Sequence, residues 1–318
     1  MKKIPEVTDQ EWEKVNEFNR SITEEFLQQA HLSPDTLTQY KSSLKIFFRW
    51  VKDKCQNKPI TDLKPRDALN YQNWLINLGL GSSAVKFKRS TVSSLCGHIE
   101  LYYNEEYPLF RNIYNKKIPN PGQSFVHDKI PLNEDEYKLL CDELEKREEW
   151  QMLAYVKFSF ASGCRRSEAR QLLKEIIDYE KVKDKTYYLT HKVRCKGKGS
   201  AGEVRKLQYD DDARNAIIKW LEIRGQDDCP FIFVKKDKNG NVEQLSRSAF
   251  NYWCTEIFSE IVGRRVHPHL FRESRATDLV VNKGKDIKSA QKLLGHKSST
   301  TTEIYVIRDD DDDLDDAF

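Results

Sequence analysis

Apolar residues recur at helical spacing through the first third of the chain. Over residues 37–51 they fall on one face of a 3.6-residue period, which predicts an amphipathic helix. Ser33 and Pro34 precede this stretch, and a serine N-cap followed by proline is typical of a helix start. Further helices are predicted over residues 67–80 and through residues 92–103, the second with Lys86, Lys88 and Arg89 at its basic start. The pattern therefore indicates an all-helical N-terminal region.

Beyond residue 130 the hydrophobic pattern predicts both helices and strands. Residues 133–136 resemble a capping box, and residues 152–160 form a strongly apolar helical stretch. Two segments rich in Tyr and Val flank a glycine-rich turn, which predicts a β-hairpin over residues 187–209. A short strand is predicted over residues 231–234 and another amphipathic helix over residues 250–261. This region is therefore expected to be mostly helical with a small antiparallel sheet.

The segment Lys116–Gln123 contains two prolines and a glycine, which favours a linker between the two regions. A length of 318 residues also fits two domains. Apolar residues make up 38% of the chain, yet no run of eighteen of them occurs, so we expect no membrane span. Residues 1–5 lack the apolar segment of a secretory signal. A cytoplasmic protein is therefore expected.

Cysteine spacing and net charge further limit the kinds of site and partner that this protein can have. The seven cysteines form no CxxC pair, so neither a disulfide framework nor a zinc site is indicated. The net charge of the chain is +3, but seven Asp lie in the last ten residues, 309–318. The rest of the chain has 53 basic and 43 acidic residues, a net charge of +10. A moderately basic body permits a polyanionic partner without requiring one. The acidic tail is expected to be solvated.

Two short segments carry arginines suited to binding an anion. In Ser162–Glu168, Arg165 is predicted to lie in a tight turn before a helix that Ser167 could cap, which would aim a guanidinium beside backbone N–H groups. His269 and Arg272 are spaced i, i+3, so on a helix they would share a face and reach one oxyanion together. Taken singly, each feature is more often structural.

Two further segments carry a histidine, a tyrosine and two lysines of possible chemical use. Gly295 is predicted to end one helix and expose His296, after which a Ser/Thr run would cap a new helix that carries Tyr305. The predicted hairpin turn holds Lys196 and Lys198, and a flexible hairpin can deliver an ammonium group as a proton donor. An exposed lysine and a core tyrosine are the ordinary alternatives.

All of these segments, in this order, resemble the tyrosine recombinase (phage integrase) family of site-specific DNA recombinases. The family's motifs are an Arg in a G-x-R-x-S-E turn, a hairpin Lys, H-x-L-R-H, L-G-H, and a Tyr nine residues later. The matching residues here are Arg165, His269, Arg272, His296 and Tyr305. The chain departs from the third motif at Phe271 and Glu273. Lys196 is favoured over Lys198 as the hairpin lysine, and Glu168 matches an acidic residue that orients the site.

The resemblance implies a mainly α fold with two domains in a C-shaped clamp. Residues 21–125 would form a helical, SAM-like core-DNA-binding domain, and residues 131–308 an α+β catalytic domain with a small antiparallel sheet. Residues 1–20 would be a leader too short for a separate arm-site domain, so the protein should read only core sites. Residues 309–318 would be the acidic tail, for which docking on another protomer and mimicry of DNA are the alternatives to a solvated segment.

The resemblance also implies the chemistry. Tyr305 would form a 3′-phosphotyrosyl intermediate, while Arg165 and Arg272 stabilise charge on the phosphate and His296 adds a hydrogen bond. Lys196 would protonate the departing 5′ oxygen, and His269 would handle the tyrosine proton. Two arginines take the charge role of a metal, so we expect no metal and no cofactor. The implied partners are double-stranded DNA with core recombination sites and three further copies of the chain, in a homo-tetramer on DNA.

The implied function is that of an integrase or recombinase of a phage or other mobile element, and two alternatives remain. A type IB topoisomerase-like relaxer is disfavoured by the two-domain layout and by the L-G-H motif. A non-catalytic DNA-binding protein of the same fold would not need His296 and Tyr305. In the N-terminal region, Lys86, Lys88 and Arg89 are expected to contact DNA phosphates; a solvated helix end is the alternative.

Overall fold

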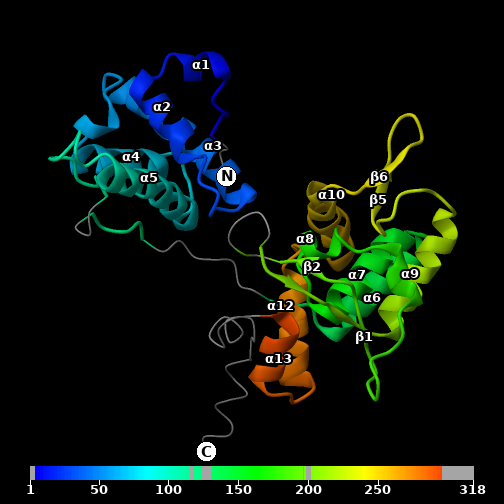
Figure 1. Cartoon of the computed structure of the whole chain (residues 1–318). Helices are drawn as coiled ribbons and strands as arrows, with labels where there is room; N and C mark the ends of the chain where they lie inside the picture. Colours follow the sequence, from blue (N-terminus) through cyan, green and yellow to red (C-terminus); the bar gives the residue numbers. More distant parts are fainter. Residues whose placement is uncertain (1–3, 115–117, 123–129, 196, 198–201, 296–318) are drawn as a thin grey trace, which may run out of the picture. The chain divides into compact units, whose positions relative to one another are not determined.

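The computed structural model describes residues 4–114, 118–122, 130–195, 197 and 202–295 (Figure 1). The chain divides near residue 128 into two compact units, and each has a hydrophobic core of its own. Among the described residues, no helix has the length and hydropathy needed to cross a membrane.

The first unit is all helical. Its core centres on α3, where Leu44, Phe47 and Val51 are fully buried. The Ser33 hydroxyl accepts a hydrogen bond from the Thr36 N–H at 3.2 Å, so the predicted N-cap is confirmed. The helices are α1 (Asp9–Glu13), α2 (Glu17–Phe26), α3 (Pro34–Lys54), η1 (Ile60–Asp62), α4 (Pro65–Asn77) and α5 (Ser82–Tyr102).

Helix α5 begins ten residues earlier than the apolar pattern predicts. Val85 is fully buried on its first turns, but the polar and basic residues around it hide the period. Lys86, Lys88 and Arg89 lie in its first two turns, so the basic start predicted for this helix is confirmed.

Part of the predicted linker is packed against this helical unit. The guanidinium of Arg89 donates to the backbone oxygen of Pro119 at 2.9 Å and to the side-chain oxygen of Asn120 at 3.3 Å. The side chain of Gln72 donates to the same Pro119 oxygen at 3.2 Å. Within the segment 116–123, residues 118–120 are therefore anchored on α4 and α5.

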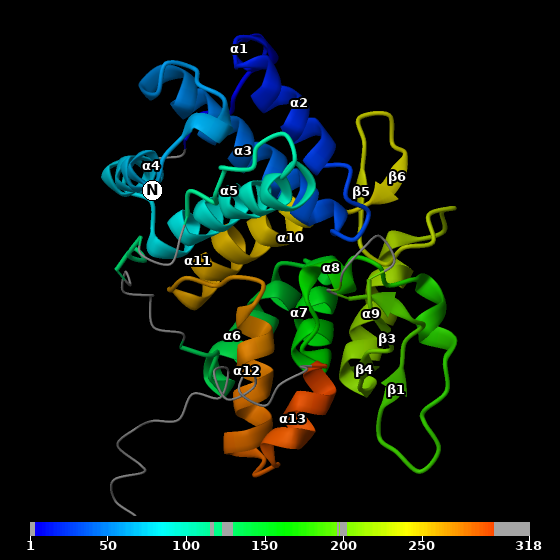
Figure 2. The same ribbon diagram turned by 60° about the vertical axis from the view of Figure 1, so that its left-hand side comes forward.

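The second unit combines helices with short antiparallel strands (Figure 2). Its helices are α6 (Glu134–Lys146), α7 (Trp150–Ser162), α8 (Arg166–Ala169), η2 (Lys174–Asp178), α9 (Asp211–Arg224), α10 (Arg247–Tyr252), η3 (Trp253–Phe258), α11 (Ser259–Val262), α12 (Leu270–Thr277), η4 (Asp278–Asn282) and α13 (Ile287–Leu294). Its strands are β1 (Tyr188–Leu189), β2 (Val193–Arg194), β3 (Val204–Arg205), β4 (Gln208–Tyr209), β5 (Val234–Lys236) and β6 (Val242–Gln244). The mostly helical class with a small antiparallel component is confirmed.

The predicted hairpin is present, and the strand predicted after it is displaced. Strand β1 pairs with β4 and β2 pairs with β3, both antiparallel, with Val193 opposite Arg205. The strand expected over residues 231–234 instead begins at Val234 and pairs with β6. Phe231 makes a single bridge to Leu173, so the apolar run enters the core before the strand starts.

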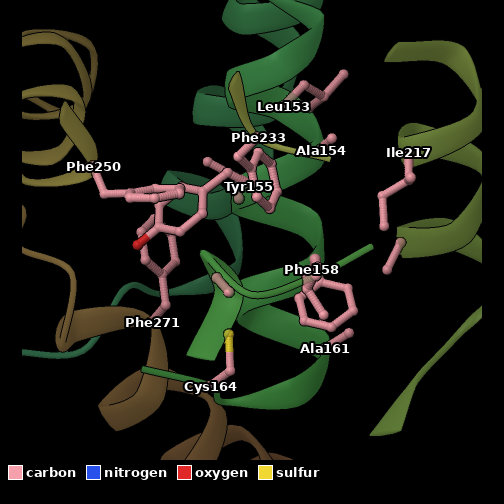
Figure 3. Close-up of a cluster of buried hydrophobic side chains, with 14 of the residues drawn as sticks. Leu153, Ala154, Tyr155, Phe158, Ala161, Cys164, Ile217, Phe233, Phe250 and Phe271 are labelled. Carbon is pink, nitrogen blue, oxygen red and sulfur yellow. The ribbon is translucent and has the colours of Figure 1, made fainter. Parts of the chain in front are cut away.

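Helix α7 is the centre of the second unit, and α6, α9 and α12 pack around it. Figure 3 shows the ring of its Tyr155 among Phe233, Phe250 and Phe271. The Tyr155 and Phe271 rings meet edge to face with centroids 5.9 Å apart, a favourable geometry. Phe271 thereby orients α12, the helix that carries Arg272.

The seven cysteines are free thiols, as their spacing predicts. Five of them are buried and pack as small apolar side chains. Burial raises the pKa of Cys164 to about 11, so this thiol beside the Arg165 turn stays protonated near neutral pH.

Candidate active site

The turn that carries Arg165 begins at Gly163, where α7 ends. Gly163 has φ +57°, a left-handed conformation that favours glycine. A Cβ atom at this position would lie 2.3 Å from Cδ2 of Leu294, so the end of α13 packs directly on the turn. Glycine is required both for the backbone conformation and for this close approach.

Arg165 is the N-cap residue of α8, and Glu168 holds it at both ends. The backbone N–H of Arg165 donates to Oε2 of Glu168 at 3.0 Å, and its Nη1 donates to Oε1 at 2.8 Å. The prediction that Ser167 caps this helix is wrong. The carboxylate of Glu168 is fully buried and must be hydrogen-bonded, whereas Ser167 lies half-buried at a pocket wall.

A second arginine, Arg205 of β3, shares the Glu168 carboxylate. Its Nη2 donates to Oε2 at 3.0 Å. Burial alone would raise the pKa of Glu168, but the charges of Arg205 and then Arg165, together with the backbone bond from Arg165, lower it below the usual value. Glu168 is therefore ionised and orients both guanidinium groups.

Sequence reasoning missed Arg205, although the strand pattern holds a signal for it. In the single strand predicted over residues 203–209, Arg205, Leu207 and Tyr209 alternate, and alternate residues of a strand share a face. Leu207 and Tyr209 are buried while Val204 is 56% exposed, so the alternation places Arg205 on the inward face. An arginine at an inward strand position needs a buried acceptor.

Replacing Glu168 with glutamine should lower the free energy of unfolding by ~3 kcal/mol at pH 7, because it removes the carboxylate that two arginines share. The lowered pKa means that the wild-type advantage is complete above the ordinary value of 4.5 and is lost as pH falls through the folded-state pKa. Urea titrations from pH 7 to below the folded-state pKa of Glu168 should show the two proteins converging in acid. A pH-independent difference would contradict an ionised Glu168.

Arg272 is fully buried and joins two segments of backbone. Its Nη1 donates to the backbone oxygen of Gly163 and its Nη2 to that of Leu294, both at 2.6 Å. His269, in contrast, is exposed at the N-cap of α12, and its backbone oxygen accepts from the Arg272 N–H at 3.0 Å. The predicted common face is therefore only partly realised, because His269 stands at the helix entrance and Arg272 one turn inside.

Arg165 and His269 face a common pocket of about 340 Å³. Cationic and imidazole groups converge there at a helix start, an arrangement that suits a phosphate. Arg272 is not among the lining residues, but it is tied to the same turn through Gly163. The pocket is lined by Arg165, Arg166, Ser167, Asn251, His267, Pro268 and His269.

The C-terminal end of α13 completes the described part of the site. Gly295 has φ +66° and ends the helix, as predicted. Nη1 of Arg205 donates to the backbone oxygen of Leu293 at 2.7 Å. The four remaining predicted site residues fall outside the described residues: Lys196, Lys198, His296 and Tyr305.

The three basic residues predicted to contact DNA differ in their surroundings. Lys86 is exposed, and Lys88 is half-buried, so that desolvation lowers its pKa. Arg89 is buried and donates to residues 118–120. DNA contact by these three residues stays a prediction.

The sequence of the chain matches models of known protein families. Residues 131–311 match the model described as "Phage integrase family", and residues 23–97 match "Phage integrase, N-terminal SAM-like domain". The SPbeta prophage-derived recombinase-like protein YomM of Bacillus subtilis is 35% identical over 321 residues, covering 99% of this chain and 95% of that protein. Tyrosine recombinase XerC of Oceanobacillus iheyensis is 26% identical, with 88% of each chain covered.

Solved structures share the fold at low sequence identity. The Tn1549 transposon integrase in complex with transposon right end DNA superposes with a TM-score of 0.68 at 15% identity, covering 94% of this chain and 98% of that one. XerH site-specific recombinase bound to a palindromic difH substrate gives a TM-score of 0.66 at 21% identity, covering 85% and 75%. With its family match over the region that carries the Arg165 turn and α12, the chain belongs to the phage integrase family of tyrosine recombinases.

Proposed function

We propose that this tyrosine recombinase cuts and rejoins duplex DNA at core sites, with Tyr305 as the nucleophile. The observation that carries the proposal is the convergence of Arg165 and His269 on one pocket, beside the turn to which Arg272 is bonded. Four predicted site residues from separate parts of the sequence thus meet around that turn: Arg165, Glu168, His269 and Arg272.

The chemistry follows from placing a DNA phosphate in this pocket. The Tyr305 oxygen attacks phosphorus and the bond to the 5′ oxygen breaks, leaving a 3′-phosphotyrosine and a 5′ hydroxyl. Arg165, oriented by Glu168, donates to the nonbridging oxygens and stabilises the charge that builds there. His269 accepts the phenol proton. The 5′ hydroxyl of a second strand then attacks the phosphotyrosine and releases Tyr305, so the number of phosphoester bonds is unchanged.

Three residues complete the proposed roles. Lys196, with Lys198 as the alternative, protonates the departing 5′ oxygen, and His296 adds a hydrogen bond to the phosphate. Arg272 supplies the second guanidinium. Because Arg272 is fully buried on two backbone oxygens, its contact with a phosphate requires the site to open toward α12 when DNA binds.

A nicked suicide substrate tests this proposal. It traps the covalent adduct because the short 5′ fragment diffuses away after cleavage. Denaturing gels should show the adduct, and trypsin digestion should leave the nucleotide on the peptide Ser298–Arg308, in which Tyr305 is the sole tyrosine. The substrate should come from DNA flanking the gene, where paired direct repeats would mark core sites.

The same assay separates the alternatives. Protein that shifts this DNA but never forms an adduct would be a DNA-binding protein that retains the fold. Relaxation of a supercoiled plasmid without any core site would instead indicate topoisomerase-like activity.

DNA affinity should fall steeply with salt. The fold neighbours include recombinases solved with DNA, and this chain carries a net charge of +10 outside its last ten residues. If it neutralises six or more phosphates, affinity should drop by ~1000-fold or more between 50 and 200 mM salt. Fluorescence anisotropy with a labelled core site measures the slope, and a flat log–log plot would contradict a basic DNA interface.

The proposal also covers the oligomeric state of the protein and the genetic element that it serves. We propose a homo-tetramer on two duplexes, acting in the cytoplasm for a phage or other mobile element and needing no metal or cofactor. Residues 21–125 would grip DNA, assisted by Lys86, Lys88 and Arg89, and residues 131–308 would carry out the strand exchange, with 1–20 as leader and 309–318 as tail.

A further inference from the structure

The last carbonyl groups of α13 are bound by two arginines from other elements. A helix leaves its final four carbonyls without intrahelical partners, and cations are favourable at that end. Here the oxygen of Leu293 accepts from Arg205 at 2.7 Å, and that of Leu294 accepts from Arg272 at 2.6 Å. One arginine comes from β3 and the other from α12.

Both arginines also bind the turn between α7 and α8. Arg272 donates to the backbone oxygen of Gly163 at 2.6 Å, and Arg205 donates to the carboxylate of Glu168 at 3.0 Å. The end of α13 is therefore fastened at two points to the segment that holds Arg165.

Side chains from these segments pack closely over two glycines. A Cβ atom on Gly163 would lie 2.3 Å from Cδ2 of Leu294, and one on Gly295 would lie 2.7 Å from Nη1 of Arg205. The side chains of Leu294 and Arg205 therefore occupy the space that a larger residue would need at these two positions.

We propose that Arg205 is a positioning residue for strand cleavage, an inference that rests on the proposed function. It fixes the point from which the chain continues to His296 relative to Arg165. It also divides the charge of Glu168 between two guanidinium groups, which leaves a net positive charge beside the pocket. Without Arg205, Glu168 would pair with Arg165 alone and the local charge would fall by one.

The Arg205→Ala protein should form the covalent adduct ~10- to 100-fold more slowly, because small displacements of reacting groups carry losses of that size. Its affinity for core-site DNA should stay within about two-fold of wild type, since few phosphate contacts are lost. Arg205→Lys should be intermediate, because an ammonium group restores the charge beside Glu168 without spanning to Leu293. Hydrogen–deuterium exchange over residues 287–295 should speed up in the alanine variant.

Arg264→Ala is the matched control. Arg264 also joins a carboxylate to backbone oxygens, since it donates to Glu136 at 2.6 Å and to the oxygen of Pro131 at 2.8 Å. Its loss should lower the melting temperature, yet leave both the adduct rate constant of the folded protein and the exchange of α13 unchanged. Burst amplitudes give the folded, active fraction, so rate constants can be compared separately.

The outcomes are distinguishable. An Arg205→Ala rate constant within two-fold of wild type, or an equal slowing by Arg264→Ala, would overturn the positioning role. Failure of the wild-type protein to form any adduct would overturn the proposed function instead. The exchange comparison over 287–295 would still test whether Arg205 holds α13, because it needs no catalysis.

Discussion

A Tyr305→Phe protein is expected to bind its core site as tightly as wild type and to form no detectable covalent adduct. The substitution removes one oxygen atom and keeps the ring, so packing and charge are unchanged while the nucleophile is lost. Adduct formation on a suicide substrate, read on denaturing gels, and mobility-shift titrations measure the two properties separately.

The control for this variant is Tyr179→Phe. The Tyr179 phenol donates to Oε1 of Glu175 at 2.6 Å, and that bond raises its pKa to about 12. Neither residue lines the pocket with Arg165 and His269, so the control should cleave at the wild-type rate. An adduct that persists in Tyr305→Phe would assign the nucleophile to another residue.

Replacing Arg272 with alanine should have two separable effects. Strand cleavage should fall by ~100-fold or more, because the guanidinium proposed to stabilise charge on the phosphate is lost. The backbone oxygens of Gly163 and Leu294 also lose their donors, and each unsatisfied buried acceptor costs ~1–3 kcal/mol of stability. Urea unfolding measures the second effect and single-turnover cleavage the first.

Arg224→Ala controls for the loss of a buried arginine. The side chain of Arg224 is 1% exposed and donates to the oxygen of Phe231 at 2.6 Å while pairing with Asp227. It should lose comparable stability but keep the cleavage rate constant of its folded fraction. If the alanine variant fails to fold, Arg272→Lys, which retains a positive charge, can be used to test whether Arg272 acts in cleavage. Folded Arg272 variants that cleave within a few-fold of wild type would show that its role is confined to holding backbone.

Structural features that depend on only a few consecutive residues could be predicted from the sequence. The N-cap at Ser33, the capping box at Asn133 and the helix end at Gly295 depend on local hydrogen bonds and local backbone conformation. The start of α5 could be placed only roughly, from its basic residues, because its first turns carry basic and polar residues around a single buried valine. The position at which α5 begins depends on the tertiary packing of Val85, which the hydrophobic pattern does not reveal.

In the candidate site, too, local motifs could be predicted from the sequence, whereas features that depend on tertiary packing could not. Arg165 and His269 could be singled out by motif, and the structure brings them to one pocket. The i, i+3 spacing of His269 and Arg272 did not predict that one would be exposed and the other buried, because that depends on where α12 begins. Arg205 was missed because its partners, Glu168 and Leu293, lie 37 and 88 residues away in the sequence.

The left-handed turn at Gly295 bears on where this chain could be joined to the sequence of a relative. Gly295 ends α13, and two arginines from β3 and α12 bind the oxygens of Leu293 and Leu294 just before it. All of the residues that make these contacts precede the end of α13, so replacing the residues after Gly295 is expected to leave the contacts in place. Chimeras joined after Gly295 should retain a native α13, whereas chimeras joined upstream of it would have to rebuild the fastening.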